Sequence, residues 1–174
     1  ANIHKEKILI TGASGGVGSA AIQLAKIRGA TIIAQCSPEK VSDLQDLGVD
    51  QTVNRDDDLV EVLGNNSVDA ILDLVGGGNW PQLLDILRPG GKYITSGAIA
   101  GPIVDLDLRS LYLKDLTLFG ATVNDKYVFE NVIQYIEKGQ IKPLVSASFP
   151  LKDIQKAQKV FMEKKFIGKL VLIP

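Results

Sequence analysis

Residues 8–26, ILITGASGGVGSAAIQLAK, constrain the fold of this chain more than any other stretch. Apolar and β-branched residues run into a cluster of glycines, and an Ala-rich amphipathic pattern follows at once. That order predicts a strand, a tight turn and the first turns of a helix. Glycines let the backbone approach a phosphate closely, and a helix N-terminus offers free N–H groups and a partial positive charge. The stretch therefore indicates a nucleotide-phosphate site.

The glycine frame departs from the strict G-x-G-x-x-G pattern of dinucleotide sites, because it reads Ala13, Gly15 and Gly18. A glycine turn that serves only strand–helix packing is one alternative. A short-chain dehydrogenase, a second alternative, needs a Tyr with Lys four residues later, and none of the four tyrosines has one. A methyltransferase, a third, usually has a carboxylate at the end of the second strand, where Cys36 stands.

Strand-like and helix-like patterns alternate along the rest of the chain. At this spacing they predict parallel strands with right-handed crossovers, hence an α/β fold with a doubly wound, Rossmann-like parallel sheet. The predicted strands are 7–11, 31–35, 51–54, 68–75, 92–96 and 116–123, and the predicted helices are 16–28, 38–47, 57–63, 80–87 and 126–138. A short C-terminal tail of strand 145–149, helix 151–164 and strand 169–173 follows, and we expect it outside the main sheet.

Composition excludes several classes of protein. Lys and Arg total 19 against 20 Asp and Glu, so no charge excess favours nucleic acid or an anionic membrane as partner. No apolar run approaches the roughly 20 residues of a membrane helix. One Cys and one His make neither an internal disulfide nor a structural zinc site, so we expect no metal in this chain. With no signal-peptide pattern, a reducing, cytoplasmic setting is expected.

The end of the second strand bears on which dinucleotide is bound. NAD sites place an Asp or Glu there for the ribose hydroxyls, whereas residues 33–37 carry no acid. Ser37, Lys40 and Arg55 supply a hydroxyl and two cations, which suit a 2′-phosphate and favour NADP(H) over NAD(H). Two alternatives stay open: the cations are solvated surface residues, or Glu39 reaches a ribose.

Several segments together resemble the medium-chain dehydrogenase/reductase superfamily, closest to its quinone oxidoreductase-like members and also similar to zinc-type alcohol dehydrogenases. The resemblance covers nearly the whole chain, in order. The segments are ILITGASGGVGSAAIQLAKIRGA, LGVDQTVNRDDD, VDAILDLVGG, LLDILRPGGKYITSGAIAG, LYLKDLTLFGATV and IGKLVLIP.

The resemblance implies a division of the chain and a missing partner domain. Residues 1–142 would be the dinucleotide-binding domain, and residues 143–174 a tail that packs on a catalytic domain absent from this chain. That domain would hold any zinc ligands and most contacts to a small-molecule substrate. Strand 116–123 resembles the edge through which relatives often form homodimers.

The resemblance also implies site residues by position. Arg55 stands where many relatives have Tyr, which changes a phenol contact to a guanidinium. Lys164 and Lys165 are expected to be solvated, and Lys169 is the tail cation that would approach the cofactor. For the apolar positions, plain strand-end packing is the alternative. The candidate cofactor-binding residues are Ser14, Gly15, Gly16, Val17 and Gly18 at the pyrophosphate; Ser37, Lys40 and Arg55 at the 2′-phosphate; Val75 and Gly76 near the ribose and pyrophosphate; and Ser96, Gly97, Ala98, Ala121 and Val123 around the nicotinamide.

The implied function is hydride transfer between a nicotinamide and a carbonyl or activated alkene, such as a quinone or enone. No catalytic residue is expected in this chain. The alternatives are the cofactor-binding domain of a zinc-dependent alcohol dehydrogenase, an enoyl reductase module, and a non-catalytic nucleotide-binding module, because fold alone does not decide function.

Overall fold

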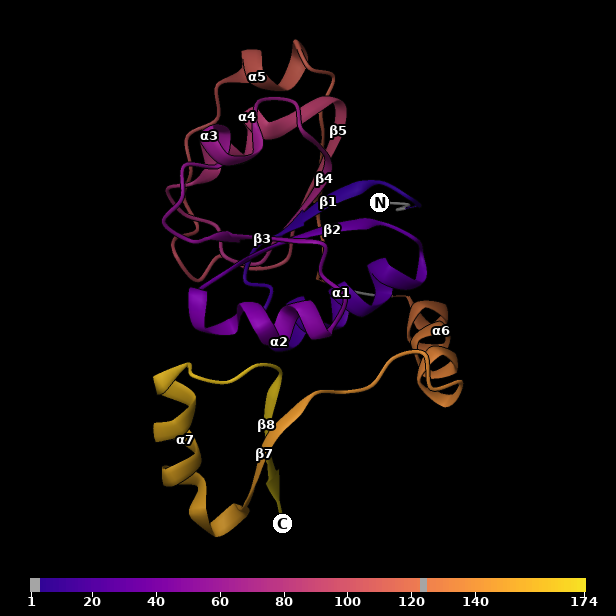
Figure 1. Cartoon of the computed structure of the whole chain (residues 1–174), viewed down its shortest axis with the longest axis vertical. Coiled ribbons are helices and arrows are strands. Elements are labelled where there is room, and N and C mark those ends of the chain that lie inside the picture. The colour runs from indigo at the N-terminus through magenta and orange to yellow at the C-terminus, as the bar shows by residue number, and fades with distance from the viewer. Residues whose placement is uncertain (1–3, 123–124) are drawn as a thin grey trace.

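The computed structural model describes residues 4–122 and 125–174, and its centre is a six-stranded parallel sheet (Figure 1). The strand order is β3-β2-β1-β4-β5-β6. The chain therefore builds outward from β1 in one direction and then, from β4, in the other, so the order reverses between β1 and β4. The strands are β1 (Lys7–Ile10), β2 (Thr31–Cys36), β3 (Gln51–Asn54), β4 (Val68–Asp73), β5 (Leu87–Thr95) and β6 (Thr117–Gly120).

Two hydrophobic cores cover the two faces of this sheet. In β1, Ile8 and Ile10 pack into one core and Leu9 into the other, because successive strand side chains point to opposite faces. The first core includes residues of α1 (Gly16–Ile27) and α2 (Val41–Asp46), and the second includes residues of α3 (Leu59–Leu63) and α4 (Trp80–Ile86). Burial on both faces explains why the central strands β1 and β2 are mainly apolar in sequence. The predicted α/β, doubly wound, Rossmann-like fold is confirmed.

The structure corrects several predicted boundaries. Strand β5 begins at Leu87, five residues before the predicted start at 92, because a register shift between its first and second pairs with β4 accommodates the intervening residues. Helix α3 begins at Leu59, since the Asp58 carboxylate accepts from the backbone N–H groups of Val60 and Glu61 and caps it. A short helix, α5 (Leu108–Tyr112), was not predicted.

The tail lies outside the main sheet, as predicted, and its two strands pair with each other in parallel. It consists of β7 (Val145–Pro150), a 3₁₀ turn, helix α7 (Ile154–Glu163) and β8 (Lys169–Ile173). Gly168 N–H donates to the Ser14 carbonyl at 3.0 Å, and Gly168 forms an isolated parallel bridge with Gly15. These contacts hold the start of β8 directly against the glycine turn.

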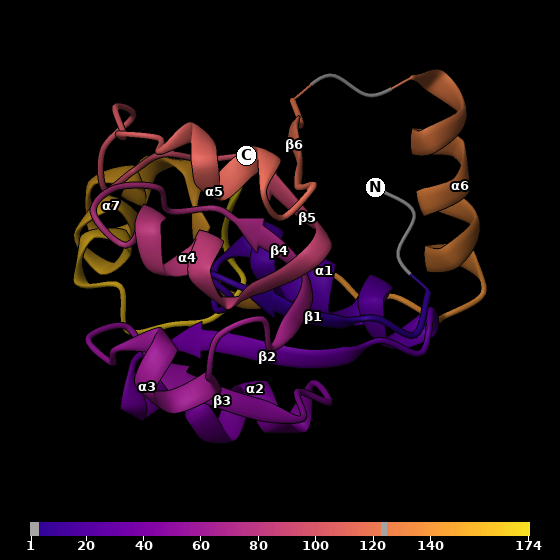
Figure 2. The same ribbon diagram turned by 90° about the horizontal axis from the view of Figure 1, so that it is seen from above.

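Helix α6 (Lys126–Glu137) stands apart from the sheet (Figure 2). None of its residues is buried, and its large apolar side chains Tyr127 and Phe129 are exposed. The segment after it is tied to α1: Gln23 Nε2 donates to the Lys142 carbonyl at 3.1 Å, and Lys142 N–H donates to Gln23 Oε1 at 2.9 Å. No helix within the described ranges is long and apolar enough to cross a membrane.

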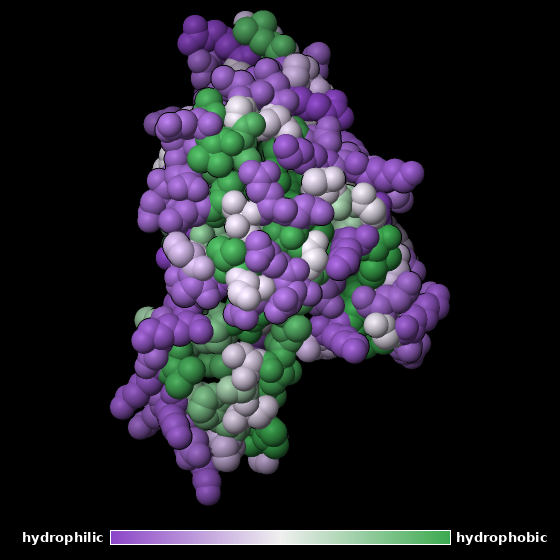
Figure 3. Space-filling view, viewed as in Figure 1, coloured by the Kyte–Doolittle hydropathy of each residue, from purple (hydrophilic) through white to green (hydrophobic). Residues whose placement is uncertain are grey.

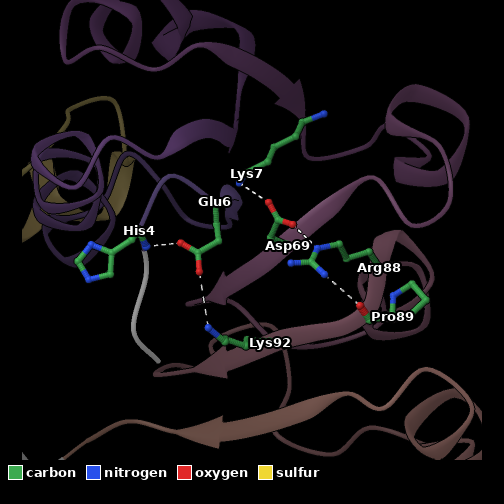
Figure 4. Close-up of polar contacts among 7 residues, drawn as sticks. All are labelled: His4, Glu6, Lys7, Asp69, Arg88, Pro89 and Lys92. Atoms are coloured by element: carbon green, nitrogen blue, oxygen red, sulfur yellow. Dashed lines mark hydrogen bonds and ion pairs between the residues drawn. The ribbon is translucent and has the colours of Figure 1, made fainter.

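Ion pairs and hydrogen bonds gather near the amino ends of the central strands (Figure 4). The Asp69 carboxylate accepts from Lys7 N–H at 2.6 Å and from the Arg88 guanidinium, and Lys92 Nζ lies 3.6 Å from Glu6. Asp69 is at the start of β4, so these contacts lie at the end of that strand away from its carboxyl-terminal residue, Asp73.

Candidate functional site

The glycine turn after β1 is shaped by close backbone contacts. Gly12 has a φ of +59°, and Gly15 N–H donates back to its carbonyl at 3.1 Å. A Cβ on Gly18 would lie 2.5 Å from the Gly12 carbonyl oxygen, so only glycine fits there without a backbone shift. Helix α1 starts at Gly16, and its first N–H groups have no partner within the helix. The turn thus places the N–H groups of a helix N-terminus at the carboxyl end of β1.

A cavity of about 750 Å³, the large cavity, opens at this turn. It lies where the strand order reverses, which is where open α/β sheets bind ligands. Its walls come from the glycine turn, the ends of β2, β3 and β4, the 99–100 loop and the tail. The lining residues are Gly12, Ser14, Gly15, Gly16, Val17, Gly18, Gln35, Cys36, Ser37, Lys40, Arg55, Leu74, Val75, Gly76, Gly78, Asn79, Ile99, Ala100, Phe161, Lys164, Phe166, Gly168, Lys169 and Leu170.

The structure brings most of the sequence-predicted residues together at this cavity. The register explains part of this: Cys36 pairs with Asn54 across β2 and β3, so the next residues, Ser37 and Arg55, emerge side by side. The predicted residues that line the large cavity are Ser14, Gly15, Gly16, Val17, Gly18, Ser37, Lys40, Arg55, Val75 and Gly76.

Of the residues predicted around a nicotinamide, only some line a cavity. Gly97 and Ala98 line a separate small cavity of about 290 Å³, which shares Gly76 with the large one. Ser96 and Ala121 line neither cavity; Ser96 N–H donates to the Asp73 carbonyl, and Ala121 N–H donates to the Thr95 carbonyl. Val123 lies outside the described residues.

A cluster of cations surrounds the end of β2. Lys40 Nζ donates to Ser14 Oγ at 3.4 Å. Burial lowers the pKa of Lys40, and the positive charges of Arg55 and Lys164 lower it further, although Glu39 opposes them. A lowered lysine pKa beside like charges means that an anion bound there would relieve repulsion. The electrostatics of the site therefore favour a negatively charged group at the end of β2.

Glu39 introduces a negative charge at the rim of this cluster. Ser37 Oγ donates to Glu39 Oε1 at 2.5 Å, and this hydrogen bond is the main cause that lowers the pKa of Glu39. The Ser37 hydroxyl is thus already engaged, and it makes no side-chain cap to the following 3₁₀ turn. Cys36 beside it is buried, which raises the pKa of its thiol.

Sequence reasoning missed most of the contribution of the tail. Lys164 is exposed, as expected, but it also lines the large cavity, and its Nζ lies 3.5 Å from the centre of the Phe161 ring. Lys169, the tail cation expected near a ligand, crosses Gly16 so closely that a Cβ there would lie 1.9 Å from its Cε. More than 100 residues separate the tail from the glycine turn, so no local pattern reports this contact.

The described residues do not fit a zinc ion. No three His, Cys, Asp or Glu side chains within 4–122 and 125–174 gather into a group that would hold a metal. Zinc sites in proteins need three or four such ligands.

Comparison with known proteins matches these features. The family model "Zinc-binding dehydrogenase" matches residues 16–138. Acryloyl-coenzyme A reductase of Sulfurisphaera tokodaii is 30% identical over 170 residues, which cover 97% of this chain and 51% of that protein. Quinone oxidoreductase 1 of Escherichia coli is 31% identical over 186 residues, which cover 97% of this chain and 57% of that protein. This chain therefore spans about half the length of these curated relatives.

A solved structure gives the same match in three dimensions. The 2-octenoyl-CoA carboxylase reductase CinF, in complex with NADP and 2-octenoyl-CoA, superposes with a TM-score of 0.87 at 27% identity, covering 98% of this chain and 44% of that one. The sheet order, the glycine turn and the family match agree. The chain belongs to the zinc-binding dehydrogenase family, as the nicotinamide-cofactor-binding half of a medium-chain dehydrogenase/reductase.

Proposed function

We propose that this chain is the NADP(H)-binding domain of an oxidoreductase that transfers hydride between nicotinamide and a carbonyl or activated alkene of the quinone or enone type. The observation that carries the choice of NADP(H) is the cluster of Lys40, Arg55 and Lys164 at the end of β2. A 2′-phosphate carries nearly two negative charges and binds best to charge-assisted donors.

The rest of the large cavity suits a dinucleotide. The N-terminus of α1 and the glycine turn, Ser14–Gly18, are the proposed pyrophosphate site, with Lys169 lying across Gly16. The nicotinamide end is proposed to extend past Val75 and Gly76 toward the small cavity, where Ser96, Gly97, Ala98, Ala121 and Val123 remain the proposed neighbours. The bound cofactor supplies the hydride, while the chain binds and orients it.

The proposed substrate class follows from the relatives, whose names specify reductases of an acyl-coenzyme A and of quinones. Substrate contacts are proposed to come mainly from a catalytic domain outside this chain. The tail, residues 143–174, would pack on that catalytic domain, and residues 1–142 would form the cofactor domain. Apolar surface gathers over the tail in the lower part of Figure 3, and Val145, Leu151 and Ile173 are exposed there. The single buried thiol fits the proposed cytoplasmic setting.

The Ser37–Glu39 hydrogen bond favours a second candidate, NAD(H). Its carboxylate stands at the end of β2, near where NAD sites place an acid for the ribose hydroxyls. A carboxylate there would also repel a 2′-phosphate. The choice therefore depends on whether one exposed Glu39 outweighs three cations.

Titration of this chain with NADPH and NADH tests the proposal. We expect NADPH to bind tighter than NADH at low salt by at least about tenfold, because each charge-assisted contact to the extra phosphate contributes roughly 1.5 kcal/mol or more. The preference should shrink as salt rises, since exposed charges are screened. Calorimetry at two ionic strengths measures both. Equal or tighter binding of NADH would assign the site to NAD(H) instead.

We also propose that the chain forms a homodimer through β6. This strand lies at the edge of the sheet and pairs with β5 on one side, and its Leu118 is exposed. An open, partly apolar edge is a template for pairing with another strand. Leu118→Lys is expected to shift the chain to monomer in sedimentation velocity, whereas Ile173→Lys, which alters the exposed tail, should not. A monomeric unaltered chain at high micromolar concentration would contradict the proposal.

A further inference from the structure

Asp73 is a buried carboxylate to which the proposed cofactor contacts assign no role. It is the last residue of β4, at the carboxyl edge of the sheet, and is 1% exposed. A carboxylate buried this deeply costs free energy unless hydrogen-bond donors surround it. The identity of those donors therefore shows which part of the fold the carboxylate holds.

Among the described residues, two of the four donors to the Asp73 carboxylate belong to the loop that follows β4. Oδ1 accepts from the backbone N–H groups of Val75 at 2.9 Å and Gly76 at 3.0 Å. The same oxygen accepts from the Thr11 hydroxyl at 2.6 Å, and that hydroxyl oxygen in turn accepts from Leu74 N–H at 2.9 Å. Three successive backbone amides, 74–76, thus end on one carboxylate, directly or through Thr11.

Tyr93 binds the second oxygen of the Asp73 carboxylate. Its hydroxyl donates to Oδ2, and its ring packs edge-on against Trp80 with centroids 4.6 Å apart. Burial, followed by the hydrogen bond to Asp73, raises the pKa of Tyr93, so the phenol keeps its proton and remains a donor. The carboxylate is therefore held in one orientation by Thr11 in the turn after β1, by Tyr93 of β5 and by its own loop.

The loop held in this way is the wall between the two cavities. Val75 and Gly76 line the large cavity, and Gly76 also lines the small one. Space there is narrow: the Gly76 backbone has a φ of +67°, and a Cβ on it would lie 2.9 Å from the Gly101 carbonyl oxygen. A small rotation of the 74–76 backbone would therefore change the shape of both cavities.

We infer that Asp73 is a positioning residue, which fixes the backbone of residues 74–76 in the conformation that a dinucleotide meets as it passes from one cavity to the other. This inference rests on the proposed function. A side chain with two acceptor oxygens is needed, because one oxygen serves three donors and the other serves Tyr93.

Asp73→Asn tests this role, with Asp69→Asn as the matched control on the same strand. Asp69 also accepts a backbone hydrogen bond, from Lys7 at 2.6 Å, but at the amino end of β4 (Figure 4). We expect Asp73→Asn to weaken NADPH binding about tenfold and to speed amide hydrogen exchange at 74–76 by at least about tenfold. Asp69→Asn should leave both unchanged, even where it lowers the thermal midpoint.

A milder pair of variants covers the case in which Asp73→Asn fails to fold. Thr11→Val removes the hydroxyl that links Leu74 N–H to Asp73, while Thr11→Ser keeps it. Faster exchange at 74–76 in the Val variant only, with weaker NADPH binding in the same variant, supports the inference.

Two results would overturn it: unchanged exchange at 74–76 in both Asp73→Asn and Thr11→Val, or equal weakening of NADPH binding by Asp69→Asn and Asp73→Asn. The exchange measurement needs no cofactor. If the unaltered chain bound neither NADPH nor NADH, the proposed function would fail, while the exchange rates would still decide whether Asp73 holds the loop.

Discussion

Gly18→Ala is expected to destabilise the chain by about 3 kcal/mol, as measured by chemical denaturation. The added Cβ would lie 2.5 Å from the Gly12 carbonyl oxygen and 2.6 Å from Ala13 Cα, and both are backbone atoms that move only with the turn. Alanine favours a helix over glycine by about 1 kcal/mol, which is too little to offset the clash. Dinucleotide binding should be lost with the turn.

Gly78→Ala is the matched control, because Gly78 lines the same cavity and a Cβ there meets nothing within 4 Å. We expect its stability to change by no more than about 0.5 kcal/mol. Comparable losses in both variants would mean that any added methyl group near the cavity is harmful, and the close contact at Gly18 would then explain nothing.

Lys164→Ala and Lys40→Ala are each expected to weaken NADPH binding by about tenfold to a hundredfold and to leave NADH binding nearly unchanged. A hydrogen bond to a charged group contributes roughly 1.5–3 kcal/mol, and only NADPH carries the extra phosphate. Both lysines line the large cavity, and their charges interact. Titration calorimetry with the two cofactors measures the ratio for each variant.

Lys165→Ala controls for the loss of one positive charge from the tail. Its ammonium is exposed, lies 3.8 Å from Glu163 and lines neither cavity. We expect this variant to bind both cofactors as the unaltered chain does. If all three variants weakened NADPH and NADH alike, the lysines would act through general charge, and a specific 2′-phosphate site would be excluded.

The sheet could be predicted because each of its signals is local. The largely apolar run 68–75, bounded by turn residues, predicts a buried strand, and the structure has β4 over 68–73. Boundaries were wrong where a hydrogen bond or a register shift decides them. The Asp58 cap places the start of α3 at Leu59, two residues after the predicted start, and β5 begins as early as Leu87 through an irregular register with β4.

In the candidate site, too, some features could be predicted from local sequence and others could not. Ser37 and Arg55 could be paired from the sequence, because they follow neighbouring parallel strands. The hydrogen bond from Ser37 to Glu39 could not be predicted from the sequence, since its geometry depends on the conformation of the 3₁₀ turn that follows Ser37. The position of Lys164 at the large cavity was not predicted, because a lysine at the end of an amphipathic helix and next to another lysine is typical of exposed surface.

The sequence by itself determined the order of strands and helices, the glycine turn and the missing acid at the end of β2, because each depends on residues close together in the chain. Only the tertiary structure decided that the tail lines the large cavity, and that one buried carboxylate accepts hydrogen bonds from the turn after β1, from β5 and from the 74–76 loop. Both depend on contacts between segments tens of residues apart. Such contacts form through packing and burial, which local sequence patterns do not encode.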